Sequence, residues 1–256
     1  RVLLPISIPI TMSFSKPASN QTSTGFPAHL SKAELRQLSE LDLAELFSEI
    51  YRKQLWGKAL TGEGELFFSG SGSHELLIVK DYLESLNYFI KGLRTKPVIV
   101  DLGCGDFNIG SQISQLADVY HACDIVPGLI KVLKAEFLLD NVQFHCLDAT
   151  REMLPDGDVL VVRQVLQHLS NDSIKKIIRQ FPRYRYVIVT EHIPSGEFLA
   201  NKDKLNGPDS RLRWRSGIDL LQQPFDLSVK KSELLCETED PNWPSSVIKT
   251  ILYEMD

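Results

Sequence analysis

Apolar and amphipathic stretches alternate along the chain from residue 98 onward. Short apolar runs predict strands, and the segments between them repeat apolar residues at helical spacing. We expect strands at 98–102, 119–124, 142–146, 158–163, 186–190, 231–238 and 247–254, and helices at 109–117, 127–139 and 172–180. The alternation is typical of a parallel sheet with helices on both faces. Only EDPNWPS separates the last two runs, which predicts an antiparallel hairpin.

The N-terminal part of the chain has a different pattern. Residues 1–30 contain few core-forming residues and predict a disordered tail, although frequent Ser and Thr without acidic residues weakly resemble an organellar targeting segment. The chain begins with arginine, so Met12 is a candidate natural start. Ser31 and Glu34 form a capping-box pattern that predicts a helix start, and helical spacing continues to Tyr51.

A second amphipathic helix is expected at 79–90, and the segment GEGELFFSGSGSHE precedes it. This glycine-rich segment is either a flexible linker or an active-site lid. We therefore expect a tail at 1–30, a helical extension with a Gly/Ser-rich lid at 31–96, and the main domain at 97–256.

Composition narrows the function classes. The chain has 28 basic and 33 acidic residues, a net charge of −5, which argues against nucleic acid or a membrane surface as the partner of the whole chain. Its four cysteines lack the spacing of a disulfide scaffold or a zinc site, so we expect a cytoplasmic protein without a metal. No apolar run is long enough to predict a membrane span.

The sequence VDLGCGDFNIG joins the first predicted strand to a helix through Gly103 and Gly105. Such a turn suits a nucleotide because glycine lets the backbone approach the ligand. The dinucleotide pattern G-x-G-x-x-G would require glycine at Asn108, and the usual S-adenosylmethionine pattern would require it at Phe107. Neither pattern fits, so the turn alone does not identify the nucleotide.

Acidic residues follow three successive strands. Asp101 ends the first strand. Asp124 ends the second strand, where a carboxylate can accept the ribose hydroxyls of either NAD or S-adenosylmethionine. Asp148 follows the third strand and could contact an adenine amino group, or it could cap a turn. Both interpretations of Asp148 remain open at this stage.

Four motifs in order, DLGCGD, CDIVPGLI, LDAT and DVLVVRQVLQHLS, resemble those of class I S-adenosylmethionine-dependent methyltransferases over residues 98–256. The resemblance implies a Rossmann-like α/β fold whose seven-stranded sheet has an antiparallel last strand. It also implies S-adenosylmethionine as the cofactor, with the methionine portion near the glycine turn, the ribose at Asp124 and the adenine at Asp148. The implied cofactor-binding residues are Asp101, Gly103, Cys104, Gly105, Phe107, Asp124, Ile125, Asp148, Ala149, Arg163 and Gln164. Phe107 departs from the family pattern and either shifts the following helix or places an aromatic ring beside the cofactor.

A sulfonium methyl group is already electrophilic, so the protein mainly has to align the acceptor and exclude water. The fourth motif lacks N/D-P-P-Y, and its VLQHL segment resembles family members that act on small molecules. Candidate general bases are His168, Glu191 and His192, each with a packing or capping role as its alternative. Glu191 and His192 are adjacent on a strand, so we expect one of them to face away from the site.

A basic loop, NKDKLNGPDSRLRWRSG, carries Arg211, Arg213 and Trp214. These residues could clamp an anionic substrate, form a solvated surface, or contact RNA. We expect a methyltransferase, monomeric or homodimeric, that methylates oxygen or nitrogen of a small molecule, anionic ones included. The alternatives are a protein or RNA methyltransferase, a non-catalytic S-adenosylmethionine-binding module, and an NAD-dependent dehydrogenase.

Overall fold

The computed structural model describes residue 34 and residues 37–38, 40–58 and 67–256. The expected tail at 1–30, the Ser31 capping box and the first part of the glycine-rich segment lie outside these residues. The principal elements are α2 (Leu43–Arg52), α3 (Leu76–Lys91), β1 (Val98–Leu102), α4 (Asn108–Ile113), β2 (Val119–Asp124), α5 (Pro127–Glu136), β3 (Val142–Cys146), β4 (Val159–Arg163), α6 (Asn171–Ile178), β5 (Tyr186–Pro194), β8 (Lys231–Glu239) and β9 (Ser246–Glu254).

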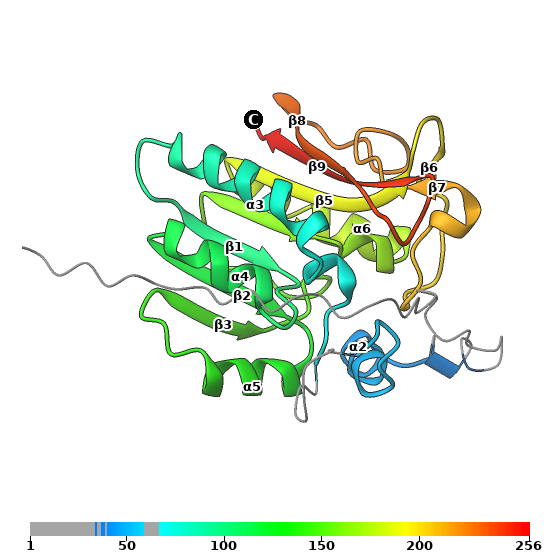
Figure 1. Cartoon of the computed structure of the whole chain (residues 1–256), viewed down its shortest axis with the longest axis horizontal. Helices are drawn as coiled ribbons and strands as arrows, with labels where there is room; N and C mark the ends of the chain where they lie inside the picture. Colours follow the sequence, from blue (N-terminus) through cyan, green and yellow to red (C-terminus); the bar gives the residue numbers. More distant parts are fainter. Residues whose placement is uncertain (1–33, 35–36, 39, 59–66) are drawn as a thin grey trace, which may run out of the picture.

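Seven strands form one sheet in the order β3-β2-β1-β4-β5-β9-β8. Strands β1 to β5 are parallel to one another, and β9 is antiparallel to both β5 and β8. The seven-stranded sheet with an antiparallel last strand is confirmed. The short turn after β8 returns the chain so that β9 lies between β5 and β8 (Figure 1).

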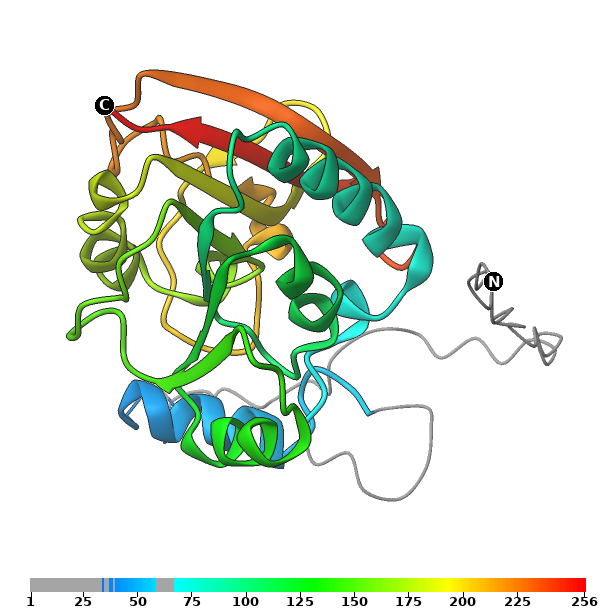
Figure 2. The same ribbon diagram turned by 90° about the vertical axis from the view of Figure 1, so that its left-hand side faces the viewer.

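The two faces of the sheet are covered by different helices (Figure 2). Ile99 and Val161 belong to the hydrophobic cluster that contains residues of α3, α4 and α5, whereas Val100 and Val162 belong to the cluster that contains α6. This division follows from the alternation of side chains along each strand. Helix α3 shares the first cluster, so it is part of the same layer even though we placed it in an extension before residue 97.

Local signals explain the helix boundaries. The Asp42 side chain accepts a hydrogen bond from the Glu45 backbone N–H at 2.9 Å and caps α2. Leu46 and Ile50 of α2 are fully buried in a small cluster, and α2 contacts α5. The Ser170 side chain accepts a hydrogen bond from the Ser173 N–H and caps α6. The helix expected at 109–117 ends at 113 and continues as the 3₁₀ turn η2 (Ser114–Leu116).

The region between β5 and β8 contains elements that we did not expect. Strands β6 (Leu199–Ala200) and β7 (Ser216–Gly217) form a two-stranded parallel sheet, and the 3₁₀ turn η5 (Leu212–Trp214) lies just before β7. Two-residue strands are too short to give a recognisable periodicity. Within the described residues, we find no helix with the length and apolarity needed to cross a membrane.

Candidate active site

The glycine turn after β1 adopts a backbone that requires glycine. Gly103 has φ of +75° and Gly105 has φ of +55°, both in the left-handed region. A Cβ atom at Gly103 would lie 2.3 Å from Cγ2 of Val165. The Gly103 and Cys104 N–H groups donate to the Cys123 carbonyl oxygen at 2.8 and 3.0 Å, which fixes the turn against β2.

Phe107 does not border the site, and the aromatic contact with the cofactor that we allowed for is wrong. Its ring is fully buried and packs edge-on against Phe137 and Phe144, with centroids 5.0 and 4.9 Å away. A Cβ atom at Gly110 would lie 2.3 Å from the Phe107 ring, so glycine at 110 makes room for it. The residue adopts φ of +64°, which turns the ring from the cavity into the core.

Two acidic residues at the ends of β1 and β2 are deeply buried. Burial raises the pKa of Asp124 to about 6, against the lowering effect of backbone N–H donors that include Val126 and Gly105. These donors lie 3.0 and 3.2 Å from its two carboxylate oxygens. Burial also raises the pKa of Asp101 to about 7, although the Tyr120 hydroxyl donates to this carboxylate at 2.8 Å.

Asp148 both caps a turn and lines the cavity. Its Oδ1 accepts hydrogen bonds from the Thr150 N–H at 2.9 Å and from the Thr150 hydroxyl at 2.6 Å. Asp148 and Ala149 also line the same cavity as Asp124. The two interpretations of Asp148 are therefore compatible: Oδ1 caps the turn, and Oδ2 pairs with the exposed Arg151 side chain at 3.5 Å.

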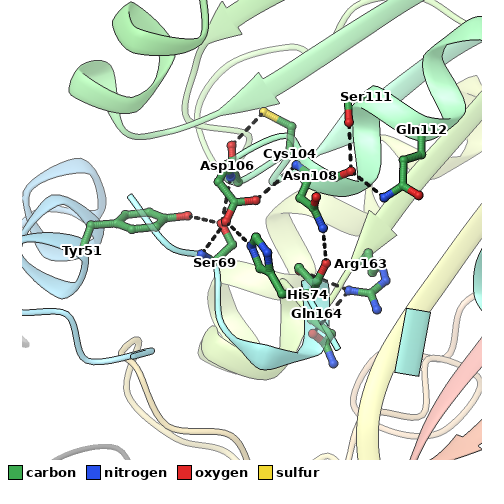
Figure 3. A network of polar contacts seen from close by, with 12 residues as sticks. Tyr51, Ser69, His74, Cys104, Asp106, Asn108, Ser111, Gln112, Arg163 and Gln164 are labelled. Carbon is green, nitrogen blue, oxygen red and sulfur yellow. Dashed lines mark hydrogen bonds and ion pairs between the residues drawn. The ribbon is translucent and has the colours of Figure 1, made fainter. Parts of the chain in front are cut away.

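A segment that we call the strap, Phe67–His74, crosses the glycine turn (Figure 3). The Ser69 N–H donates to Oδ2 of Asp106 at 2.7 Å, and the Asp106 N–H donates to the Ser69 hydroxyl at 2.8 Å. His74 pairs with the same carboxylate oxygen at 2.7 Å, and Tyr51 contacts the Ser69 hydroxyl at 3.0 Å. A Cβ atom at Gly105 would lie 2.3 Å from this hydroxyl, so the strap fits only over glycine.

The other end of the strap is attached to β4. Arg163 donates to the Gly72 carbonyl oxygen at 2.6 Å and to the Ser73 hydroxyl at 3.3 Å. Its guanidinium lies 4.9 Å from the ring centroid of Tyr82 on α3. A Cβ atom at Gly72 would lie 2.2 Å from the Gln164 side chain. Arg163 and Gln164 therefore border the cavity, as expected, and also hold the strap.

Glu191 faces away from the cavity, and its expected role as a base is not supported. Its carboxylate accepts the N–H groups of Leu166 and Gln167 at 2.9 and 2.8 Å and caps the 3₁₀ turn η3 (Leu166–His168). Burial raises the pKa of Glu191 to about 8 despite these bonds. As expected for adjacent strand residues, only one of the pair, His192, lines the cavity.

The two histidines differ in their surroundings. His168 lies in the cavity wall beside Trp56, with ring centroids 5.0 Å apart, and burial lowers its pKa to about 3. It is therefore neutral and a weak base at neutral pH. His192 Nε2 lies 2.7 Å from the Ser246 hydroxyl oxygen and 3.8 Å from Oδ2 of Asp240. Burial lowers the pKa of His192, and the Asp240 charge opposes this effect.

The expected anion clamp does not form around Arg211. This side chain is 1% exposed, and its nitrogens donate to the Asn171 side chain and to backbone carbonyls of Leu166, Gln167, Leu169 and Lys202. Its donors are thus committed to internal acceptors. Trp214 packs against Arg213 and Lys202 outside the cavity, whereas Arg213 reaches the cavity wall while paired with Asp209 at 2.8 Å.

A single cavity of about 710 Å³ connects these groups, a volume suited to a small-molecule ligand. Of the residues expected at the site, it is lined by Asp101, Gly103, Cys104, Gly105, Asp124, Ile125, Asp148, Ala149, Arg163, Gln164, His168, His192 and Arg213. Sequence reasoning missed lining residues from the N-terminal part, the glycine turn and the hairpin turn, namely Tyr51, Trp56, Ser69, Tyr82, Asp106, Asp240 and Trp243. In the sequence, the features that could have pointed to some of these residues were the aromatic side chains on the predicted helix faces and the glycine-rich segment.

The neighbouring strands β2 and β3 together carry two histidines and two cysteines. The structure brings His121 Nδ1 to 3.0 Å from His145 Nε2. In the part of the chain that the structure describes, no group of three or more His, Cys, Asp or Glu side chains is arranged to hold a metal ion.

Residues 99–184 match a family model described as a methyltransferase domain. The chain is also similar to malonyl-[acyl-carrier protein] O-methyltransferases of Bacillus anthracis, with 32% identity over 110 residues, and of Bacillus cereus, with 31% over 84 residues. The aligned regions cover 42% and 32% of this chain. The chain spans only 38% and 30% of the lengths of these relatives.

Solved structures confirm the fold. An S-adenosylmethionine-dependent methyltransferase of Leishmania major matches with a TM-score of 0.55 and 16% identity, covering 88% of this chain and 91% of that one. The magnesium protoporphyrin IX methyltransferase of Synechocystis with bound S-adenosylmethionine matches with a TM-score of 0.52 and 12% identity, covering 84% and 98%. The family match thus identifies a methyltransferase domain within residues 99–184, and these structures share the fold that the ordered motifs predicted for it.

Proposed function

We propose that this chain transfers a methyl group from S-adenosylmethionine to an oxygen or nitrogen atom of a small molecule. The observation that carries the proposal is the single cavity that joins two sets of groups. At one end lie the glycine turn, Asp124 and Asp148, and at the other lie His192, Asp240 and Trp243. A cofactor and an acceptor bound at these two ends would share one enclosed space.

The residues at the first end fit the cofactor. Each Asp124 carboxylate oxygen accepts one backbone N–H, and an ionised carboxylate oxygen can accept another hydrogen bond, so both could receive ribose hydroxyls. The missing side chains at Gly103 and Gly105 leave room for Val165 and for the Ser69 hydroxyl, and both glycines line the cavity. When bound, S-adenosylmethionine supplies an electrophilic methyl group.

The protein's own contribution is to enclose and orient the acceptor. The strap lines the cavity and is bonded to the glycine turn through Asp106 and to β4 through Arg163, so we expect it to limit the access of water. Such enclosure is the main catalytic requirement for transfer from a sulfonium group. The aromatic residues Tyr51, Trp56 and Tyr82 line the same cavity and suit a small acceptor.

The relatives named above support oxygen methylation, because they are malonyl-[acyl-carrier protein] O-methyltransferases. Their similarity covers only part of each chain, so we infer only the chemical class of the acceptor. Arg211 is committed to backbone acceptors, which leaves Arg213 and Arg163 as the cavity-lining arginines for an anionic group on the acceptor.

Isothermal titration with S-adenosylhomocysteine, and in parallel with NAD, tests the cofactor assignment. We expect binding of S-adenosylhomocysteine alone, its loss in Asp124→Ala, and its retention in Asp118→Ala, which removes an exposed carboxylate at the start of β2. Binding of NAD alone, or of neither compound, would contradict the proposal.

Methyl transfer from labelled S-adenosylmethionine to fractionated cell extract tests the acceptor class. We expect the label in the low-molecular-mass fraction. Label found only in macromolecules and lost after nuclease or protease treatment would instead indicate an RNA or protein acceptor. Binding of S-adenosylhomocysteine with no transfer to any fraction would indicate a non-catalytic binding module.

A further inference from the structure

We infer that His192 takes the acceptor's proton at its Nδ1 atom, and that Ser246 and Asp240 are positioning residues that hold the ring in the required tautomer. This inference rests on the proposed function and specifies the chemistry at the acceptor end of the cavity. It assigns roles to the turn between β8 and β9, which the sequence motifs do not cover.

The hydrogen bonds of Ser246 fix the tautomer. Its Oγ donates to the Trp243 carbonyl oxygen at 2.6 Å, and a hydroxyl has only one proton to donate. The same Oγ lies 2.7 Å from His192 Nε2, so in that contact the oxygen must accept and Nε2–H must donate. A neutral imidazole protonated at Nε2 carries its free lone pair on Nδ1. Nδ1 is therefore the basic atom of His192.

Asp240 stabilises the charge that forms when this base is protonated. Its Oδ2 lies 3.8 Å from His192 Nε2, too far for a hydrogen bond but close enough for an ion pair with an imidazolium. The two side chains are only 5% and 9% exposed, so solvent screens their interaction weakly. The Asn242 N–H donates to Oδ1 of Asp240 at 2.8 Å and holds the carboxylate in this position.

The fold brings these residues to the cavity from two strands that pair antiparallel. His192 on β5 lies opposite Ile248 of β9, and Ser246 begins β9. Asp240 and Trp243 line the cavity, and the Trp243 ring meets the His192 ring edge-on at 6.3 Å. Asn242 also donates to the Glu75 side chain at 2.8 Å, which joins the hairpin turn to the residue after the strap. The hydrogen bonds that hold the side chains of His192, Asp240 and Ser246 come from the hairpin region itself and do not involve the glycine turn.

The arrangement selects an acceptor that must lose a proton, such as a hydroxyl or an amine. The acceptor oxygen or nitrogen forms a bond to the methyl carbon, the methyl–sulfur bond breaks, and its electron pair stays on sulfur. The acceptor's proton moves to Nδ1, and the resulting imidazolium lies beside Asp240. A carboxylic acid acceptor is already ionised at neutral pH and needs no such base.

The tautomer can be measured without an acceptor. Two-bond ¹⁵N–¹H correlation spectra of the ¹⁵N-histidine-labelled full chain distinguish the two neutral forms, and His192→Gln assigns the signal. We expect the Nε2–H form, and a shift toward a mixture in Ser246→Ala. Ser232→Ala, an exposed position on β8, is the matched control and should leave the spectrum unchanged. An Nδ1–H form in the unsubstituted protein would overturn the assignment.

Kinetics with the low-molecular-mass extract fraction test the base. Gln can still donate to Ser246 from the place of Nε2 but has no basic atom at Nδ1, so we expect His192→Gln to lower kcat by roughly 100-fold or more. Its affinity for S-adenosylhomocysteine should be unchanged. Asp240→Asn and Ser246→Ala should lower kcat more than they raise KM, while His121→Gln, outside the cavity, should do neither.

The two proposals fail in different ways. Full activity of His192→Gln with normal S-adenosylhomocysteine binding would overturn the base and leave the methyltransferase function standing. If the unsubstituted protein does not bind S-adenosylhomocysteine, or transfers no methyl group to any fraction, the proposed function is overturned, and with it the catalytic role of His192. In that case the ¹⁵N–¹H correlation spectrum would still show whether Ser246 fixes the tautomer of the His192 ring.

Discussion

The attachment of the strap to the glycine turn depends chiefly on one side chain, Asp106. Its carboxylate accepts the Ser69 N–H and pairs with His74, both at 2.7 Å, and the carboxyl group is only 14% exposed. Burial raises the pKa of Asp106, but the bonds from His74 and the backbone outweigh this effect and leave the pKa below its usual value. The ionised form therefore holds the strap throughout the neutral range.

Replacing Asp106 by alanine removes both contacts with the strap. A hydrogen bond to a charged group contributes about 1.5–3 kcal/mol, and the His74 contact should contribute less because that side chain is 32% exposed. We therefore expect Asp106→Ala to lower the free energy of strap opening by about 2–3 kcal/mol, which corresponds to about 30- to 150-fold in its equilibrium constant. Asp106→Asn can still accept from Ser69 and should lose only about 1 kcal/mol.

Amide hydrogen exchange of peptides covering residues 67–75 measures this opening directly. We expect exchange of these peptides to accelerate by about 30- to 150-fold in Asp106→Ala and by a smaller factor in Asp106→Asn. Exchange of peptides from α6, on the opposite face of the sheet, should change little. Asp172→Ala, an exposed residue of α6, is the matched control. Equal exchange in Asp106→Ala and the unsubstituted protein would refute the view that Asp106 fastens the strap.

Three further predictions concern Asp124, Phe107 and Arg211. Because the folded pKa of Asp124, about 6, lies above its ordinary value of 3.8, its contribution should lower the free energy of unfolding of the ligand-free protein as pH rises from about 4 to 6. Affinity for S-adenosylhomocysteine should rise with pH up to about pH 7 as Asp124 ionises, and it should be about tenfold weaker at pH 5 than at pH 8. Calorimetry that shows no pH dependence, or one retained in Asp124→Asn, would contradict this. Phe107→Ala should lower the free energy of unfolding in urea by about 3–5 kcal/mol, and a loss below about 1 kcal/mol would contradict its core position. Arg211→Met should lose about 3 kcal/mol in the same assay because buried carbonyl groups lose their donors, whereas the exposed Arg213→Met should change by less than about 0.5 kcal/mol; equal effects would contradict the internal role of Arg211.

Periodicity and turn composition were sufficient to predict the architecture. Each of the seven main strands falls where an apolar run predicted it, and the Val- and Ile-rich runs of β1, β4 and β5 are buried on both faces, as expected for central strands. The positions of Asp101, Asp124 and Asp148 also followed from topology, since the carboxyl ends of parallel strands meet at one edge of the sheet. These inferences use only the order of elements.

The sequence could not predict which neighbouring polar residue faces which partner. Arg211 looks like a surface cation, but acceptors more than thirty residues away in the sequence surround it. Phe107 occupies the usual glycine position because the remote residues Phe137 and Phe144 pack around its ring, with room left by the nearby Gly110. Both outcomes depend on space between segments that are remote in the chain.

The sequence by itself determined the sheet, the glycine turn and the acidic residues that follow its strands, because these depend on local periodicity and on the direction of parallel strands. Only the tertiary structure decided that the strap crosses the turn through Ser69 and Asp106, and that His192 rather than Glu191 meets the cavity beside Asp240. Hydrogen bonds and ion pairs between remote segments require particular distances and orientations, and these exist only once the chain has folded.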